Sequence, residues 1–424
     1  MSAPLRILIT TDAFPPVCGG SGWSTWELVR GLTARGHHVD VLKVEAGPEA
    51  GIFRTAYEGQ RVTVFRQPAP QVPVVRNLAK NERMWSKATT YLLSEHLRQH
   101  PVDVLHAQHV MTTVPTIRAG ESAGVPVVAT VRDYWPVCYW SDLIYDPASP
   151  TLCPECTTSM MRRCVVPRAG GATVVAWSLI PYMRANLRTK RTTLARASAI
   201  IAVSSRIAAD LPVRAPEVQR TPIFTIPNPV DLTLLDRAGS RPPLLDGPYA
   251  LYAGKLAPNK GVRFLLPAWA GAGLDWPLVV VGDGPDRGAL EAEARERNLD
   301  VRLLGWRDRS EVLTWMRHAT LLAFPSYGPE SLSRVLLEAA ALGVPIAAMR
   351  TGGTEDILHA GTTALLSDTP EGLARDLARL GRDERLRGAL AHAARIDVRA
   401  RFSADSVVDR IEQVYRGLLA PRAA

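Results

Sequence analysis

The chain has 424 residues, which is too long for one ordinary hydrophobic core, so we expect two or three domains. With 46% hydrophobic and 21% charged residues and no low-complexity tract, the composition excludes a disordered or fibrous protein. The net charge of +9 comes from residues 1–225, which carry 25 Lys and Arg against 16 Asp and Glu, so an anionic partner is expected for the first half.

Short apolar runs alternate with amphipathic helical stretches from the first residues onward. Near-continuous apolar strands separated by helices predict a parallel sheet covered on both faces, which is a doubly wound Rossmann-like domain. The chain runs straight into its first strand, so we expect no signal peptide and a cytoplasmic protein. We predict that residues 1–228 form this first domain, with strands at 6–10, 38–44, 62–65, 102–106, 125–130 and 199–203.

A glycine-rich turn follows the first predicted strand. Gly19, Gly20 and Gly22 precede a helix that we expect to begin near Trp23. Glycines let a backbone approach a ligand closely, and a helix N-terminus favours anions, so the turn predicts a phosphate contact at Gly20. The spacing does not match a dinucleotide-binding fingerprint, and a tight structural loop is the alternative.

Polar side chains follow the next strands of the first domain. His106 and His109 lie at the end of the strand at 102–106, and Arg132 and Asp133 follow the strand at 125–130. Ligands of doubly wound domains bind at the carboxyl ends of the strands, so these four residues are candidates for the acceptor side of a site. For the two histidines, packing at a strand end is the simpler interpretation.

Four of the five cysteines fall in one loop-like insert. Cys138, Cys153, Cys156 and Cys164 could close a tetrahedral structural zinc site and thereby hold together a segment without a core. The outer spacings are irregular for a zinc ribbon, so reduced, buried cysteines are the alternative. Five cysteines in a chain of this length do not describe a disulfide framework, in keeping with a reducing cytoplasm.

A basic stretch overlaps the end of this insert. Between Cys156 and Ala209 the sequence has no acidic residue, and Trp177 and Tyr182 are interleaved with the bases. The stretch predicts either a solvated surface or contact with a lipid head group, a phosphorylated acceptor or nucleic acid. The aromatic residues favour the inner face of a membrane, and without a nucleic-acid-binding motif we expect no nucleic-acid partner. The nine bases are Arg162, Arg163, Arg168, Arg184, Arg188, Lys190, Arg191, Arg196 and Arg206.

A second series of apolar strands occupies the other half of the chain. We expect a second Rossmann-like domain at 229–403, because prolines and Asn228 interrupt the alternation near 227–231. A final amphipathic helix at 404–420 needs a partner surface. The strands of this second series are predicted at 249–253, 278–281, 301–304, 320–323 and 345–348.

Two lysines follow the first strand of the second series. Lys255 and Lys260 lie five residues apart on one loop beside Gly254. They can converge on a diphosphate and stabilise the negative charge that develops on a leaving group. Taken alone, two solvated lysines would be the simpler interpretation.

The strongest pattern lies at 328–338. Its Pro and Ser residues suit a helix start, so the backbone amides at 331–333 would face an anion along the helix axis. Glu338 lies two turns into that helix, where it would reach a hydroxylated group such as a ribose. Glu330 lies ahead of the helix, and a carboxylate so close to a diphosphate is unfavourable unless it binds sugar hydroxyls or a developing positive charge.

These motifs resemble glycosyltransferase family 4, a group of retaining enzymes with the GT-B fold. Glu330 and Glu338, with seven residues between them, match the most diagnostic motif of that family. The resemblance covers nearly the whole chain and is most specific in its second half. Further matches are the Gly19-Gly20 loop and residues 227–231, 281–285, 323–326, 339–345 and 352–355.

The resemblance implies an α/β fold of two Rossmann-like domains that face a cleft, with the final helix crossing back to the first, acceptor-binding domain. It implies transfer of a sugar with retention from a nucleotide sugar, a UDP-sugar before a GDP-sugar, to a glycan or lipid-linked acceptor, as in polysaccharide biosynthesis. No metal or other cofactor is expected in the reaction, because lysines and helix amides take the place of Mg²⁺. The catalytic residues implied are Glu330, Lys260 and Lys255. The donor-binding residues implied are Gly20, Gly254, Lys255, Lys260, Glu330, Ser331, Leu332, Ser333 and Glu338.

Two positions depart from the family pattern. Arg132 stands where the family has a His that contacts the donor sugar, and Ser333 replaces a usual glycine. Arg132 could pair with a uronate carboxylate on the donor or have only a structural role. The alternatives to a transferase are a non-catalytic glycan- or membrane-binding protein with the same fold, or a nucleotide-sugar epimerase. The intact lysines and glutamates favour the enzyme.

Overall fold

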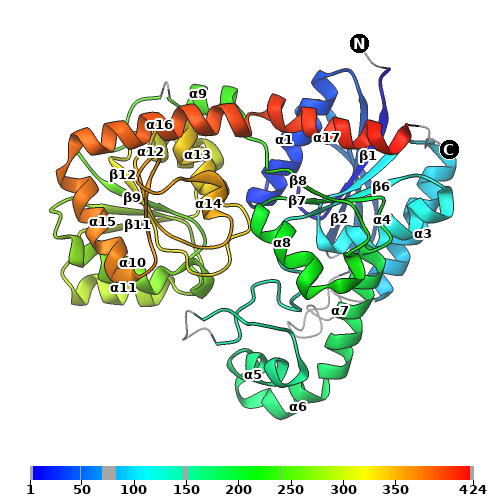
Figure 1. Cartoon of the computed structure of the whole chain (residues 1–424), viewed down its shortest axis with the longest axis horizontal. Helices are drawn as coiled ribbons and strands as arrows, with labels where there is room; N and C mark the ends of the chain where they lie inside the picture. Colours follow the sequence, from blue (N-terminus) through cyan, green and yellow to red (C-terminus); the bar gives the residue numbers. More distant parts are fainter. Residues whose placement is uncertain (1–2, 48, 69–82, 147–150, 240, 421–424) are drawn as a thin grey trace. The chain divides into compact units, whose positions relative to one another are not determined.

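A computed structural model describes residues 3–47, 49–68, 83–146, 151–239 and 241–420. They form two compact units, each an α/β unit around its own sheet (Figure 1). The first unit comprises Met1–Ser141, Glu155–Pro229 and Ala404–Ala424, and the second comprises Asp142–Pro154 and Val230–Ser403. The sequence placed the main boundary between 228 and 229 and did not single out Asp142–Pro154.

The sheet of the first unit has the strand order β3-β4-β2-β1-β5-β6-β7-β8. β3 pairs antiparallel with β4, and the remaining neighbours are parallel. β5, β6 and β7 are buried along their whole length, as expected of strands that helices cover on both faces. The strands are β1 (Arg6–Thr11), β2 (His38–Gly47), β3 (Gly51–Tyr57), β4 (Gln60–Pro68), β5 (Val104–Ala107), β6 (Val127–Val131), β7 (Ala199–Ala202) and β8 (Ile223–Thr225). The helices are α1 (Gly20–Ala34), α3 (Arg83–Gln99), α4 (Val110–Ala123), α5 (Thr158–Ala169), η1 (Gly170–Ala172), α6 (Thr173–Ser178), α7 (Ile180–Leu194), α8 (Ser205–Arg214), η2 (Pro216–Val218) and α17 (Ala404–Leu419).

The sheet of the second unit has the order β11-β10-β9-β12-β13-β14, and its neighbouring strands are parallel. Its core is formed by apolar strand residues and by helices such as α10 and α15. The strands are β9 (Ala250–Ala253), β10 (Leu278–Val281), β11 (Val301–Gly305), β12 (Leu321–Phe324), β13 (Ile346–Met349) and β14 (Leu365–Ser367). The helices are α9 (Leu232–Gly239), η3 (Pro258–Lys260), α10 (Val262–Ala272), α11 (Arg287–Glu296), α12 (Arg309–His318), α13 (Arg334–Leu342), α14 (Thr354–Ile357), α15 (Pro370–Arg382) and α16 (Glu384–Phe402).

Strands β3, β8 and β14, each at an edge of its sheet, were not predicted from the sequence. β3 is largely exposed, so it lacks the continuous apolar run that marks the parallel strands. β8 and β14 have three residues each, which is too short for a recognisable pattern. In each sheet the chain first adds strands on one side of its central strand, β1 or β9, and then continues on the other side of that strand. This order of the inner strands is the one expected of doubly wound domains.

The last helix, α17, belongs to the first unit although it follows the second unit in sequence. Its apolar face lies in one core with Leu28, Val29 and Leu32 of α1. The contact supplies the partner surface that the amphipathic pattern requires. The buried residues of this face are Val407, Val408, Ile411, Val414 and Tyr415.

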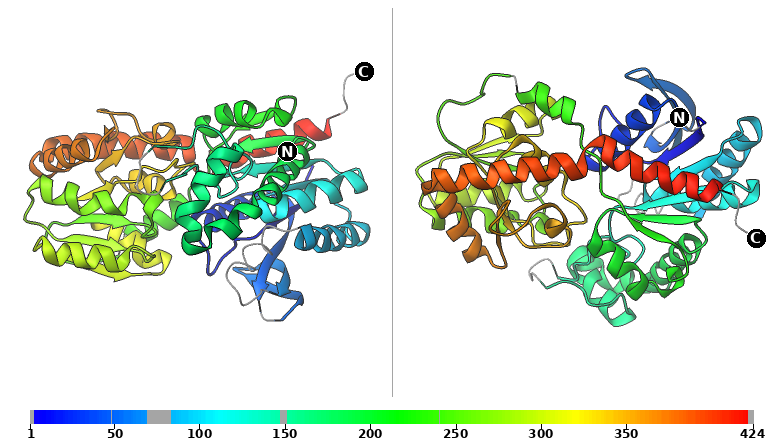
Figure 2. Two further views of the ribbon diagram at one scale, coloured as in Figure 1. Left: turned by 90° about the horizontal axis from the view of Figure 1, so that it is seen from below. Right: turned by 45° about the horizontal axis from the view of Figure 1, so that its top comes forward.

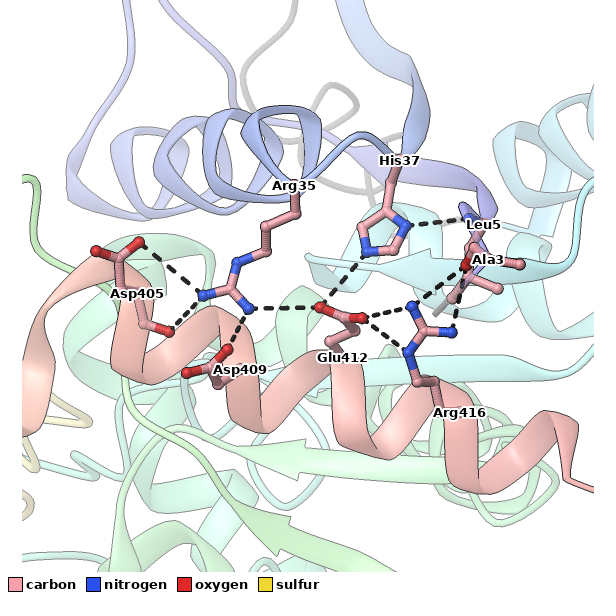
Figure 3. Close-up of polar contacts among 8 residues, drawn as sticks. All are labelled: Ala3, Leu5, Arg35, His37, Asp405, Asp409, Glu412 and Arg416. Atoms are coloured by element: carbon pink, nitrogen blue, oxygen red, sulfur yellow. Dashed lines mark hydrogen bonds and ion pairs between the residues drawn. The ribbon is translucent and has the colours of Figure 1, made fainter. Parts of the chain in front are cut away.

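Charged side chains fix the other side of α17 (Figure 3). Arg35, which follows α1, donates to Asp409 and, at 3.4 Å, to Glu412. Arg416 donates to the same glutamate at 2.7 Å and contacts the carbonyl oxygen of Ala3. Burial alone would raise the pKa of Glu412, but Arg416 and His37 hold it below its usual value. The helix is thus held by an apolar face and by a row of ion pairs.

Within the described residues, no single helix is long and apolar enough to cross a membrane. Thr158–Ser178 and Ile180–Leu194 meet the length and composition criteria together, but they are bent by 83° at their junction.

Candidate functional site

In the second unit, the loops that follow β9 and β12 come together beyond the carboxyl ends of the strands. Lys260 ends η3, and Gly261 after it has a φ of 66°. A Cβ on Gly261 would lie 1.9 Å from the carbonyl oxygen of Pro325, so the two loops can approach this closely only with glycine here.

This approach brings Lys260 to Glu330. The Lys260 Nζ lies 2.5 Å from Glu330 Oε1, and the Ser326 hydroxyl donates to the same oxygen at 2.6 Å. The loop after β13 supports the glutamate from another direction, since the amide of Gly353 donates to its carbonyl oxygen at 2.7 Å. Glu330 is only 7% exposed, whereas Lys260 is 33% exposed. The carboxylate is therefore held by residues of the β9 and β12 loops and its backbone by the β13 loop, while the ammonium group remains partly open to a ligand.

Lys255, the other predicted lysine, lies at the start of the same loop and is exposed. The Tyr252 hydroxyl donates to the Lys255 carbonyl oxygen at 2.9 Å, which fixes the backbone and leaves the side chain to solvent. Burial and the charge of Glu330 raise the pKa of Tyr252, so this hydroxyl stays a donor at neutral pH. Both lysines thus lie on the β9 loop, and in this structure Lys260 is the one paired with Glu330.

Glu338 lies on α13, between two arginines. Arg309 and Arg334 both donate to its Oε1, at 2.9 and 2.8 Å. Neither arginine was predicted as a partner of Glu338 from the sequence. Arg334 precedes Glu338 by four residues on one helix, a spacing that predicts an ion pair. Arg309 comes from α12, and no pattern in the sequence connects it to α13.

The residues just before α13 lie slightly outside the helix. Ser333 is its N-cap, and its hydroxyl accepts from the Leu336 amide at 3.4 Å. Ser331 and Leu332 precede this cap, so the first-turn amides belong to Arg334 and its successors. The amides at 331–333 therefore belong to the loop before α13 and not to its first turn. Their contact with an anion stays a prediction.

In the first unit, the glycine-rich turn leads directly into α1. The helix begins at Gly20, so the prediction of a start near Trp23 was wrong by three residues. Gly19 is the N-cap without a side-chain cap, and the first turn has no acidic residue. Gly20 is exposed, so its backbone is accessible to a ligand.

The two histidines at the end of β5 differ in burial and in their contacts. His106 is fully buried and bonds the Tyr415 hydroxyl at 2.5 Å and the Thr130 hydroxyl at 2.6 Å. His109 caps α4, and its Nδ1 lies 2.8 Å from the Thr11 hydroxyl. Burial and the positive charge of Arg132 lower the pKa of both rings to about 3, so both are neutral. His106 consequently has a packing role, joining β5 to α17, and both of its ring nitrogens are occupied.

Arg132 and Asp133 point to separate partners. The Arg132 guanidinium donates to the side-chain oxygens of Asn228 and Gln108. Burial raises the pKa of Asp133 to about 6, against an opposing bond from the Trp135 amide and the charge of Lys190.

Lys190 is a residue that the sequence analysis counted only as part of a basic stretch. It is buried, and burial lowers its pKa to about 8 although Asp133 opposes this shift. Its position could have been anticipated, because Met183, Leu187, Lys190 and Leu194 form the buried stripe of α7. A charge on an apolar stripe needs an internal partner, which here is Asp133.

The cysteines of the insert are mostly buried. Cys138, Cys153 and Cys164 are buried, Cys156 is partly exposed, and none forms a disulfide in the described part of the chain. Within the residues that the structure describes, no group of three or more His, Cys, Asp or Glu side chains is arranged to hold a metal ion. The four cysteines are therefore not arranged as a zinc site in this structure, and zinc binding stays a prediction.

The family model of Glycosyltransferase Family 4 matches residues 18–234, just over half of the chain. The chain belongs to glycosyltransferase family 4. A second model, Glycosyl transferases group 1, matches residues 247–383, which include Lys255, Lys260, Glu330 and Glu338. The membership predicted from the motifs is thus confirmed, and the two models together span both units.

Curated proteins of similar sequence can be compared with this chain. The alpha-D-kanosaminyltransferase of Streptomyces kanamyceticus is 31% identical over 185 residues, 40% of this chain and 46% of the relative. The chain spans about half the length of the curated relatives it matches.

Solved structures resemble the chain over nearly its full length. Sucrose-phosphate synthase from Thermosynechococcus elongatus has a TM-score of 0.71 at 18% identity and covers 97% of this chain and 99% of its own. HepE from Anabaena in complex with UDP-glucose has a TM-score of 0.65 at 18% identity, covering 97% and 100%. These likenesses confirm the GT-B fold predicted for this family 4 chain.

Proposed function

We propose that the chain is a retaining glycosyltransferase that moves a sugar from a nucleotide sugar to a hydroxyl group of a glycan or lipid-linked acceptor. The observation that carries this proposal is the Lys260–Glu330 pair, 2.5 Å long, on the loops beyond β9 and β12. An accessible ammonium group and a carboxylate held by neighbouring loops suit a ligand that carries both a diphosphate and hydroxyl groups.

In the proposed reaction, the bond between the anomeric carbon and the diphosphate breaks while the acceptor oxygen bonds to the same face of that carbon. The acceptor proton passes to the departing diphosphate, and the products are the glycoside and the nucleoside diphosphate. Lys255 and Lys260 would stabilise the growing charge on the diphosphate. When the donor binds, Glu330 would release Lys260 and accept hydrogen bonds from hydroxyls of the donor sugar. Glu338, which lies between Arg309 and Arg334, would accept hydrogen bonds from the ribose hydroxyls.

UDP-sugars are the favoured donors and GDP-sugars the next. The support is that HepE, which has the same fold, was solved with UDP-glucose. We infer metal-independent transfer from the two cationic side chains on the β9 loop, which can supply the charge that a divalent ion supplies elsewhere. A polysaccharide acceptor stays part of this proposal.

Calorimetry with UDP, GDP and ADP tests the donor site. We expect one nucleotide, UDP first, to bind the wild type, with affinity unchanged by a chelator. Lys260→Ala should weaken that binding by about 10- to 100-fold, because a charge-assisted contact to phosphate is lost. Lys87→Ala is the matched control, since Lys87 is an exposed lysine of α3.

Product analysis tests the stereochemistry. With the donor that binds, the anomeric configuration of the product, measured by NMR, should equal that of the donor. Inversion would contradict the retaining mechanism. If none of the three nucleotides binds, the proposed donor site is wrong and the non-catalytic alternative takes its place.

A further inference from the structure

The first unit carries a helical extension that none of the proposed donor contacts uses. We call α5, η1, α6 and α7, residues 158–194, the helical appendage. Figures 1 and 2 show α5 and α6 at the end of α7 that lies away from the sheet of their unit. The segment Gly170–Ser178, which forms η1 and α6, has no buried residue. The appendage therefore presents a surface that the unit itself does not cover.

Apolar side chains are concentrated on this surface. Val174 and Val175 of α6 are 75% and 70% exposed, Trp177 is 41% exposed, and Val166 of α5 is 45% exposed. Val174 and Trp177 are three residues apart and so share one face of the helix. Single exposed apolar residues are ordinary, but a group of them on one projecting tip marks a contact surface.

The same appendage is uniformly basic. Arg162 and Arg163 of α5 and Arg184 and Arg188 of α7 are exposed, and residues 157–209 contain no acidic side chain. Two further bases of the stretch lie outside the appendage: Arg196 pairs with Glu121, and Arg206 pairs with Asp210. The appendage therefore carries much of the excess positive charge of the first half of the chain.

Three arginines of α7 also border a cavity of about 590 Å³. They are Arg184, Arg188 and Arg191, and Met161 of α5 and Glu217 also line the cavity. A cavity lined by arginines and apolar side chains suits a phosphate group that is attached to a hydrophobic molecule.

We propose that the helical appendage docks on an anionic lipid surface. The valines and Trp177 enter the interface between head groups and acyl chains, and the arginines contact head-group phosphates. Charge complementarity alone would suit any polyanion. The exposed apolar tip selects a lipid surface, because a nucleic acid or a soluble phosphorylated glycan has no apolar layer to receive it.

Vesicle co-sedimentation tests this docking. The probes are vesicles of phosphatidylcholine with about one third phosphatidylglycerol, and vesicles of phosphatidylcholine alone. The wild type should bind the anionic vesicles more tightly, and added salt should weaken that binding. The double variant Val174→Asp/Val175→Asp should bind at least about tenfold more weakly, since two apolar contacts are lost and two negative charges are gained. Arg162→Glu/Arg163→Glu should reduce binding and its salt dependence.

Matched controls lie on the same unit outside the appendage. Val213→Asp changes a valine of α8 that is 79% exposed, and Arg220→Glu changes an exposed arginine. Both should bind anionic vesicles as the wild type does. Lipids brominated on the acyl chains should quench part of the tryptophan emission, and Trp177→Phe should lose that part.

Two results would overturn the docking proposal. One is no binding of the wild type to anionic vesicles at low salt. The other is wild-type binding by Val174→Asp/Val175→Asp, which would point to a soluble polyanion instead. UDP calorimetry on the same variants separates this test from the donor site. Failure of UDP binding alone contradicts the proposed function, whereas loss of vesicle binding with UDP binding intact concerns the appendage.

Discussion

The carboxyl ends of the two sheets use polar residues in different ways. In the second unit, Lys260 and Glu330 form a charged pair that remains partly open to solvent. In the first unit, His106 is buried and His109 is nearly so, and both are neutral at pH 7, with pKa values lowered to about 3. The same topology therefore carries accessible charge at one sheet and a buried polar network at the other. Position at a strand end alone does not distinguish a binding group from a structural one.

The largest effect is expected from Glu330→Gln. The change keeps the shape of the side chain but removes the negative charge beside Lys260. We expect kcat to fall by about two to three orders of magnitude, roughly 3–4 kcal/mol of barrier. Steady-state kinetics with the donor identified by calorimetry measures this fall. Glu355→Gln is the control, because Glu355 is exposed and pairs with Arg350. An equal fall of kcat in both variants would contradict a specific role of Glu330 in the reaction.

Glu338→Ala should lower stability more than any surface change in the second unit. Its removal leaves Arg309 and Arg334, both almost fully buried, without their shared carboxylate. We expect the free energy of unfolding to fall by about 3 kcal/mol in urea titration. If stability is unchanged while nucleotide affinity collapses, Glu338 acts as a ligand contact and its arginines do not depend on it.

Asp133 and Lys190 of the first unit predict a dependence of stability on pH. Burial raises the pKa of Asp133 to about 6, so folding favours its neutral form. The contribution of the neutral Asp133 carboxyl to folding stability is fully present below the pKa of aspartate in the unfolded chain, near 4. It is lost as the pH rises through about 6. Lys190 behaves in the opposite sense, since its pKa is lowered to about 8 and stability is lost as the pH falls through that value.

Asp133→Asn isolates the carboxylate in this pair. Between pH 4 and 6 the wild type should lose about 1–2 kcal/mol relative to the variant, as measured by denaturant unfolding at each pH. Parallel pH profiles of the two proteins would mean that Asp133 is as well solvated when folded as when unfolded.

Tyr415→Phe has the smallest expected effect. The change removes the hydroxyl that bonds His106 and keeps the packing of the ring. We expect a loss of about 1 kcal/mol in thermal or denaturant unfolding, with unchanged affinity for nucleotide and acceptor. A change in acceptor KM without a change in stability would show that His106 faces a substrate.

Much of the second unit follows from local sequence. The alternation of apolar strands and helices predicts its sheet, and Lys260 and Glu330 lie in short motifs directly after strands β9 and β12. Arg309 could not be inferred, because its contact with Glu338 depends on how α12 packs beside α13. Local pattern locates a side chain on its element, whereas only tertiary packing selects its partner.

The polar groups of the first unit depend on longer connections. His106 bonds a tyrosine 309 positions away, and Arg132 bonds an asparagine 96 positions away. No spacing rule connects residues so far apart. The sequence could still have indicated Lys190, because its place on an apolar helix stripe is a local pattern that requires a buried partner.

The placement of α17 bears on how the protein is made. A ribosome releases all of the second unit before it releases the helix that completes the core of the first. Until then the core that α1 shares with the sheet lacks the buried side chains of α17, among them Val408 and Ile411. The unit that begins first during translation is therefore the one that finishes last, and its nascent form needs protection from association for most of the time of synthesis.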